Sequence, residues 1–442
     1  MYPNPQDALP FPLQPNLEQF KKQAKDLVKA SRSSDPDALH GWAKAWIESL
    51  VRSSDLKIIG NMPINRENWI RQLAAFARTA LERQRSLTQA QFVIARAEGF
   101  ESWPRLGKHI QALERSGTLV SRFEAAADAI VTGDLNGLKQ LLRADPELAK
   151  ARSNREHRAT LLHYASANGV EGYRQQTPGN IVQIARLLLE SGAEVDAVCN
   201  VYDGDSTTLG LTATSIHPER AGVQLELMDL LLEHGARTDL LGSAGGQHTL
   251  IFACLANGQP RAARHLMRLG APLDFVSAAG LGCLDVVKQF FATAEHDLPN
   301  AEVLNAYAYG CGYGSAEVVG YLLNKGGDVN AELKVHGSGH TGLHIAAFHG
   351  QVEVAKLLLQ RGARLDILDK TWGTPALAWA LAGWQRNGTP DDLRYYELVA
   401  RLVAAGAEVK QEWLIDPNSQ ASVSKIQSDP RMQSALRGAM PK

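Results

Sequence analysis

Cysteine is scarce in this 442-residue chain, and its four cysteines are Cys199, Cys254, Cys283 and Cys311. They form no CxxC pair and no ligand-like cluster with histidine, so we expect reduced, mostly buried thiols. Long apolar runs are also missing, since no segment approaches the roughly 18 apolar residues that a membrane helix needs. The opening MYPNPQDALPFPLQPN lacks the basic and apolar regions of a signal peptide. We therefore expect a soluble, cytoplasmic protein without a membrane partner.

The chain has no excess of charge of either sign. Its 46 Lys and Arg residues against 47 Asp and Glu residues leave a net charge of -1. Residues 1–120 hold 17 basic and 12 acidic residues, a balance of +5, which leaves 29 against 35, or -6, for the remainder. Nucleic-acid binding depends on a strong basic field. This mild asymmetry supplies none, so no nucleic-acid partner is expected.

Common catalytic signatures are absent as well. The sequence contains no HExxH, no GxxxxGK[ST], no GxSxG and no dinucleotide-binding fingerprint. The glycine-rich stretches GSAGGQ at 242 and GCGYGS at 310 do not fit either phosphate-binding spacing, and turns or tight packing explain them better. We therefore expect no cofactor.

What the chain does contain is an internal repeat, which marks a repeat architecture. An apolar helical end, a glycine and a short extended piece recur along it. The glycines are spaced by 43, 35, 56, 36 and 44 residues, and the interval of 56 contains LDFVSAAGLGCLDVVKQFF, which fits a shortened repeat with almost no hairpin. Glycine suits a helix end that requires a left-handed residue. The six glycines are Gly192, Gly235, Gly270, Gly326, Gly362 and Gly406.

A second signature precedes these endings: TLLHYASANG at 160, TTLGLTAT at 207, TGLHIAAFHG at 341 and TPALAWALAG at 374. Together the two motifs resemble the ankyrin repeat, in which a T-P-L-H segment and a G-A-D-V-N ending bracket two antiparallel helices. The resemblance covers residues 120–412 and gives eight repeats when the degenerate FEAAADAIVTGDLNGLKQLLRADPELAKA is included. Bacterial ankyrin proteins with a helical N-terminal module are similar. The resemblance implies an all-α ankyrin-repeat solenoid that binds a protein or peptide.

The two ends of the chain have a different pattern. Residues 1–119 show helical apolar spacing in four or five segments, which predicts an N-terminal helical bundle with Trp42, Trp46, Trp69 and Trp103 chiefly in its core. The bundle could cap the first repeat, because an open solenoid end exposes apolar surface. Residues 413–442 include DPRMQSALRG, which predicts a final capping helix in a C-terminal capping segment.

Four histidines gather in HGSGHTGLHIAAFHG, residues 336–350. His344 occupies the histidine position of T-x-L-H, where a hydrogen bond within the hairpin region is expected, and His163 is its counterpart. Five residues at 100° each place His344 and His349 about 140° apart around a helix, whereas zinc ligands all lie about 2 Å from one ion. We therefore expect no metal site, and any metal would be restricted to His336 and His340.

The repeat register also predicts the concave face, and we expect the partner to bind there through aromatic anchors and polar contacts. A solvated face with incidental aromatics is the alternative. Three turns between paired helices are longer than in the standard repeat. A functional role and a tolerated insertion explain them equally well. These turns are VEGYRQQTPGN at 170, SIHPERAGV at 215 and GWQRNGTPDDLRYY at 383. The predicted concave residues are His157, Tyr202, Asp203, Asp205, His248, His336, His340 and Trp372 from hairpins, and Asn168, Asn257, Tyr313, Phe348 and His349 from helices.

An alternative function of another class is a small-molecule enzyme or ligand receptor with its pocket in the concavity. Neighbouring repeats place Asp203 and Asp205 within reach of His248. A carboxylate that orients an imidazole is a usual acid–base arrangement, and Tyr202 could donate a further proton. Gly210 replaces the motif histidine of the same repeat and leaves room there. Turn formation by Asp and Gly is the competing explanation.

Overall fold

The computed structural model describes residues 4–12, 14–53, 62–202, 204–239, 249–293, 300–334, 339–389, 392–409, 425–426 and 428–440. The chain divides into two compact units, Met1–Pro272 and Leu273–Lys442, and each is described by itself. The described residues form mostly helices, with one two-stranded sheet. The expected all-α, ankyrin-type solenoid with a helical N-terminal region is therefore confirmed.

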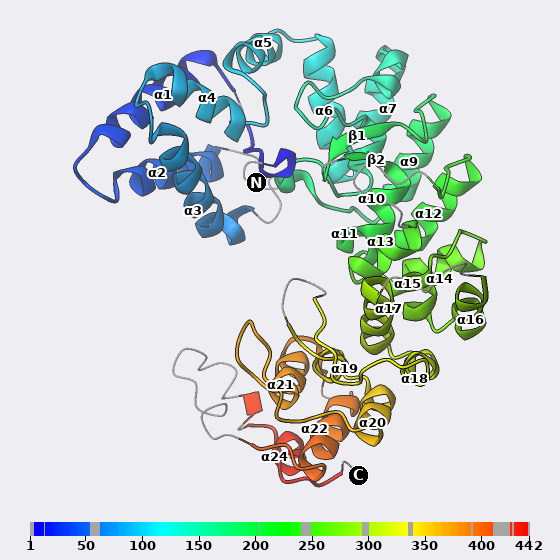
Figure 1. Ribbon diagram of the computed structural model, residues 1–442. Coiled ribbons are helices and arrows are strands. Elements are labelled where there is room, and N and C mark those ends of the chain that lie inside the picture. Colours follow the sequence, from blue (N-terminus) through cyan, green and yellow to red (C-terminus); the bar gives the residue numbers. More distant parts are fainter. Residues whose placement is uncertain are drawn as a thin grey trace. The chain divides into compact units, whose positions relative to one another are not determined.

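The N-terminal part of the first unit is a helical bundle, seen at the blue end of Figure 1. A capping box at Asn16, whose side chain accepts from the Gln19 amide, starts the first helix, and Ser86 caps the fourth. Trp42 and Trp46 are buried in its core, with Trp69 and Trp103 partly buried against it. After the short η1 (Pro5–Asp7), the helices are α1 (Leu17–Arg32), α2 (Ala38–Ser53), α3 (Met62–Leu81), α4 (Leu87–Ala97) and α5 (Trp103–Leu113).

Four helix pairs complete the first unit, coloured cyan to green in Figure 1. The β-hairpin of β1 (Val198–Val201) and β2 (Gly204–Thr207) projects before the third pair, with Asn200 opposite Asp205. The pairs are α6 (Leu119–Thr132) with α7 (Leu135–Ala144), α8 (Leu161–Tyr164) with α9 (Ile181–Glu190), α10 (Thr208–Thr214) with α12 (Gln224–Glu233), and α13 (Leu250–Ala256) with α14 (Pro260–Arg268). Shorter elements between them are η2 (Pro146–Lys150), η3 (Gly172–Arg174) and α11 (Ile216–Arg220).

The second unit continues with four more pairs, so the described residues contain the eight expected repeats. The first helices of successive repeats stack on one another, α15 on α17, α17 on α19 and α19 on α21. We call these the inner helices. The pairs are α15 (Phe275–Leu281) with α16 (Leu284–Thr293), α17 (Asn300–Tyr313) with α18 (Ala316–Asn324), α19 (Gly342–Phe348) with α20 (Val352–Gln360), and α21 (Ala376–Asn387) with α22 (Arg394–Ala404).

The repeat-ending glycines are where the sequence predicts them. All six have a positive φ, between 83° and 102°, a backbone region that side chains with a Cβ disfavour. The shortened repeat in the 56-residue interval is also confirmed. Its α15 starts directly after a cap at Asp274, whose side chain accepts from the Ser277 amide, so no hairpin separates it from the preceding repeat.

The sequence predicted the position of one lengthened turn wrongly. The turn expected from residue 383 starts only after Asn387, because α21 continues through the buried Trp384. Gly383 lies inside this helix, where an added Cβ would stand 2.0 Å from the Phe348 carbonyl oxygen. Glycine there permits α19 and α21 to approach closely rather than forming a turn.

Residues near the C-terminus cover the last repeat. The helix α24 (Pro430–Ala435) packs on α22, and the Tyr396 hydroxyl donates to the Asp429 carboxylate at 2.7 Å. The Lys425 ammonium lies 4.5 Å from the centre of the Trp384 ring. This contact fits the capping role expected of DPRMQSALRG. No helix among the described residues is long and apolar enough to cross a membrane.

Candidate functional site

Aromatic side chains line up along the inner helices of the second unit. Tyr313 ends α17, Phe348 and His349 end α19, and Trp379 lies in α21. The Phe348 ring packs edge-on against Trp379, with centroids 6.0 Å apart, and against His349 at 5.2 Å. An added Cβ at Gly312 would lie 3.7 Å from the His349 ring, so α17 and α19 approach closely there. With Trp372, these residues form what we call the inner aromatic row.

Trp372 belongs to the hairpin of residues 369–374, which one buried carboxylate organises. The Asp369 carboxylate accepts hydrogen bonds from the backbone amides of Thr371, Trp372 and Thr374, from the Thr374 hydroxyl, and from the Trp379 indole at 3.2 Å. We call this hairpin the Asp369 finger. Trp372 stands on it with 68% of its surface exposed and packs against Trp379, the centroids 5.4 Å apart. The finger therefore presents a large apolar side chain from a fixed backbone.

The Asp369 carboxylate remains ionised. Burial by itself would raise its pKa, but the hydrogen bonds from Trp372, Thr374 and Trp379 outweigh burial and hold the pKa well below the ordinary value. In the part of the chain that the structure describes, no Lys or Arg forms an ion pair with it. The nearby Lys370 is paired with Glu332 at 2.6 Å instead.

The motif histidines are structural, as the T-x-L-H pattern predicts. His344 accepts from the Thr341 amide through Nδ1 at 3.2 Å, and its Nε2 lies 3.2 Å from the Thr374 carbonyl oxygen of the next finger. His163 makes the same bonds with Thr160 and with Ser206. Burial lowers the pKa of both rings, that of His163 to about 4. Each imidazole thus links its own helix start to the hairpin of the following repeat as a neutral ring.

The other expected concave residues occupy varied positions. His340 is almost fully buried against Trp379, whereas His349 is exposed. Asn257 is exposed and donates to the carbonyl of Ala253 in its own helix. His336, like Asp203 and His248, lies outside the described residues. Among the described residues no group of three or more His, Cys, Asp or Glu side chains could hold a metal.

The structure brings together two predicted residues of the first unit. The Tyr202 hydroxyl donates to Asn168 at 2.5 Å, and the Asn168 amide donates to the Leu211 carbonyl and the Thr214 hydroxyl. Tyr202 has a φ of 55°, which is unusual for a side chain with a Cβ. Asp205, also proposed for acid–base work, is exposed on β2. Tyr202 and Asn168 therefore form a fixed polar contact between two hairpin–helix repeats.

A buried cluster of charges, which sequence reasoning missed, joins the bundle to the first repeats. We call Glu124, Asp128, Arg155, Glu171 and Arg174 the buried ionic cluster. Glu171 Oε1 lies 2.7 Å from Arg155 Nε, and Arg174 reaches Glu124 at 2.8 Å and Asp128 at 2.6 Å. The Arg155 guanidinium also donates to the carbonyl of Glu98, at the end of α4 in the bundle.

Aromatic rings and a fully buried acid surround Arg155. Its guanidinium lies 4.6 Å from the centre of the Phe11 ring and 5.6 Å from that of Phe100, both in the bundle region. The Glu98 carboxylate is completely buried and has no hydrogen-bond partner among the described residues, and burial raises its pKa well above the ordinary value. A raised pKa favours the neutral acid.

The expectation that His157 lies on the concave surface is wrong. Its ring is fully buried, with Nε2 3.3 Å from the Glu171 carboxylate. Burial opposes ionisation of Glu171, but Arg155, His157 and Arg174 outweigh it and hold the pKa well below its usual value. The first lengthened turn, VEGYRQQTPGN, supplies Glu171 and Arg174, so it is part of a structural joint. No spacing rule in the sequence pairs these distant residues.

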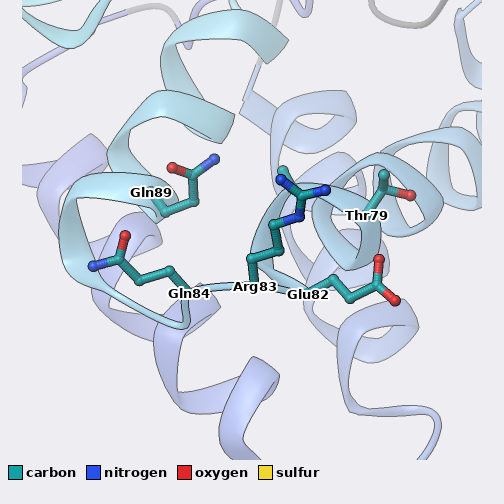
Figure 2. A pocket seen from close by; sticks show the side chains of 6 residues that line it. Thr79, Glu82, Arg83, Gln84 and Gln89 are labelled. Atoms are coloured by element: carbon teal, nitrogen blue, oxygen red, sulfur yellow. The ribbon is translucent and has the colours of Figure 1, made fainter.

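A shallow polar depression of about 490 Å³ lies between the end of α3 and the start of α4. Figure 2 shows Thr79, Glu82, Arg83, Gln84 and Gln89 around it. Both charged side chains, Glu82 and Arg83, are exposed. Well-formed ligand sites combine apolar and aromatic walls with a few convergent polar groups, whereas Ala80 is the one apolar residue among the six that line this depression.

In the first unit, α5 of the bundle packs on α6 of the first repeat, and in the second unit α24 packs on α22 of the last repeat while the inner helices present aromatic residues. Comparison with known proteins agrees with a helical-repeat class. Residues 275–370 match the family model for ankyrin repeats, in three copies. This match supports an ankyrin-repeat protein, and because ankyrin repeats generally mediate protein–protein interactions, it also supports a general protein-interaction scaffold.

Two curated proteins of Caenorhabditis elegans are similar to parts of the chain. The E3 ubiquitin-protein ligase hecd-1 is 40% identical over 113 residues, which are 26% of this chain and 4% of that protein. Protein glp-1 is 25% identical over 235 residues, which are 52% of this chain and 16% of that protein. The chain thus matches only a small part of the length of either. The crystal structure of the human ASB11 ankyrin repeat domain is 22% identical with a TM-score of 0.31, covering 60% of this chain and 98% of that one.

Proposed function

We propose that this protein binds a protein or peptide partner through the concave face of its ankyrin array, with the inner aromatic row as the main contact. The observation that supports this most is the row itself, in which Trp372 is the most exposed large apolar side chain among the described residues. Aromatic residues dominate binding energy at protein interfaces. A binding role explains their position on consecutive inner helices better than a packing role does.

Pre-organisation supports the same proposal. Five hydrogen bonds fix the Asp369 finger, and Gly383 and Gly312 hold the inner helices close together. A rigid surface loses little conformational entropy when a partner binds, which increases affinity. Within the second unit, α24 covers α22 of the last repeat, while Trp372 remains exposed to a partner.

The enzyme alternative has weaker support. Tyr202, its proposed proton donor, is hydrogen-bonded to Asn168, and Asp205 is exposed on a hairpin. Two of its four residues, Asp203 and His248, lie outside the described residues. The aromatic row therefore remains the better-supported site.

A photo-crosslinking experiment with the full chain tests the proposal. A photoreactive residue replaces the exposed His349 on the inner face, and a matched chain carries it at Leu393, at the start of the outer helix α22. We expect one partner to be captured from the His349 position only. Purified partner should then bind Tyr313→Ala/Phe348→Ala at least about tenfold more weakly. Equal capture at both positions, or unchanged affinity with an intact fold by circular dichroism, would contradict the proposal.

A further inference from the structure

The Asp369 finger and α21 together form a corner of two indole rings. The Trp372 and Trp379 rings meet edge to face, at 63° with centroids 5.4 Å apart. Phe348, His340 and His344 also contact Trp379, so its ring is fixed from several sides. One compact side chain of a partner can therefore touch the exposed Trp372 and the partly exposed Trp379 together. We call this the indole corner.

The electrostatics of the indole corner favour a cation. Aromatic faces carry the negative part of the ring quadrupole and attract guanidinium and ammonium groups. The ionised Asp369 carboxylate accepts hydrogen bonds from the Trp379 indole at 3.2 Å and from the Trp372 backbone amide at 2.7 Å, so a negative charge adjoins the corner. Lys370, the neighbouring cation, is held by Glu332 at 2.6 Å. The corner thus combines a negative charge with two electron-rich faces.

We propose that the indole corner binds an arginine side chain of the partner, the planar guanidinium stacking on Trp372 beside Trp379. Arginine fits better than lysine because its guanidinium is flat, more weakly hydrated than an ammonium, and stacks on aromatic rings. This inference rests on the proposed partner-binding function and specifies the chemistry of the partner segment. An extended, arginine-containing peptide meets the requirement.

Fluorine NMR on the full chain labelled with 5-fluorotryptophan tests the corner directly. The chain has eight tryptophans, and the variants Trp372→Phe and Trp379→Phe assign the two signals. The probes are three capped tripeptides, Gly-Arg-Gly, Gly-Lys-Gly and Gly-citrulline-Gly, at matched ionic strength. Citrulline keeps the shape of arginine without its charge. We expect saturable shifts of the Trp372 and Trp379 signals, about two- to fivefold tighter for arginine than for citrulline, with lysine between them.

Two variants provide the controls. Trp372→Leu keeps an exposed apolar side chain and the backbone bond to Asp369, and it should abolish the arginine-dependent shift of Trp379. Leu368→Ala, a half-exposed position just before the finger, should leave the titration unchanged. Equal shifts with citrulline, shifts that persist in Trp372→Leu, or no shift with any tripeptide would each overturn the inference.

The test also separates this inference from the proposed function. Suppose that a partner is captured from the His349 position and that each of its contacting arginines is then replaced by citrulline. An unchanged affinity would contradict the inference and leave the proposed function intact. Arginine-specific shifts at Trp372 without any partner captured at His349 would support the corner and contradict the proposed function.

Discussion

The substitution Glu171→Gln tests the buried ionic cluster most sharply, because it removes one charge and hardly changes the shape of the side chain. Glu171 Oε1 lies 2.7 Å from Arg155 and 3.6 Å from Arg174, and the carboxylate is fully buried. At an effective dielectric constant near 20, each such pair attracts by roughly 5 kcal/mol. Desolvation of the carboxylate offsets several kcal/mol of this. Since the fully buried Arg155 would lose its partner at 2.7 Å and keep only the longer contact with Glu124 at 3.8 Å, we expect the first unit to lose about 3–5 kcal/mol of stability.

Hydrogen exchange measured by mass spectrometry can localise this loss. A change of about 3 kcal/mol corresponds to at least roughly hundredfold faster exchange of the slowest amides in residues 97–110 and 153–175. Asp239→Asn is a suitable control because it breaks the exposed Arg237–Asp239 pair, and exposed pairs contribute little. Exchange less than about tenfold faster in Glu171→Gln would refute the view that these buried charges stabilise the joint.

The same cluster predicts a pH dependence. The pKa of Glu171 in the folded chain lies well below its ordinary 4.5. Its contribution is therefore present above about pH 4.5 and is lost as the pH falls through the folded pKa. Asp128 acts in the opposite sense, because burial raises its pKa. Denaturation midpoints of the first unit should fall in acid for the unmodified chain and fall less for Glu171→Gln; parallel profiles would contradict the assignment to Glu171.

Three further predictions concern the second unit. Gly362→Val should destabilise by roughly 1–2 kcal/mol through the backbone alone, because φ is 83° and no atom lies near the added Cβ; an unchanged urea midpoint would refute this. Gly383→Ala should cost more than Gly362→Val, since its Cβ meets the Phe348 carbonyl and forces α19 and α21 apart; a smaller shift of the urea midpoint would count against that close approach. Purified protein should hold less than one equivalent of transition metal, and elemental analysis that finds zinc lost in His336→Ala/His340→Ala would show otherwise.

Local signals account for the features that could be predicted from the sequence. Helix periodicity and caps such as Asn16 locate the bundle helices, and the glycine endings locate the repeats, because both depend on residues a few positions apart. The register also placed Trp372 on a finger. Its partner Trp379 was missed, since within TPALAWALAG it fits an ordinary core position. Asp369 could have been noticed, because an aspartate at the start of a turn often accepts the following amides.

Long-range pairing could not be predicted in the same way. Arg155 contacts the carbonyl of Glu98 and the carboxylate of Glu171, and these three residues are related only through the folded positions of the bundle and a lengthened turn. From the sequence alone, the turn VEGYRQQTPGN therefore fitted a tolerated insertion as well as it fitted a functional segment. The helical continuation of α21 past Gly383 was missed for a similar reason, because glycine at a close helix contact resembles glycine in a turn.

The buried ionic cluster also limits how this protein can change. A repeat in a solenoid normally contacts only its neighbours, so one unit can be exchanged for another. Here the second repeat carries Glu171 and Arg174 toward Arg155 and Glu124, and Arg155 in turn contacts the bundle. A generic repeat in its place would strand a guanidinium and a carboxylate away from water. We therefore expect the bundle, the first repeat and the second repeat to tolerate exchange only as one block, because the contacts of Arg155 connect all three.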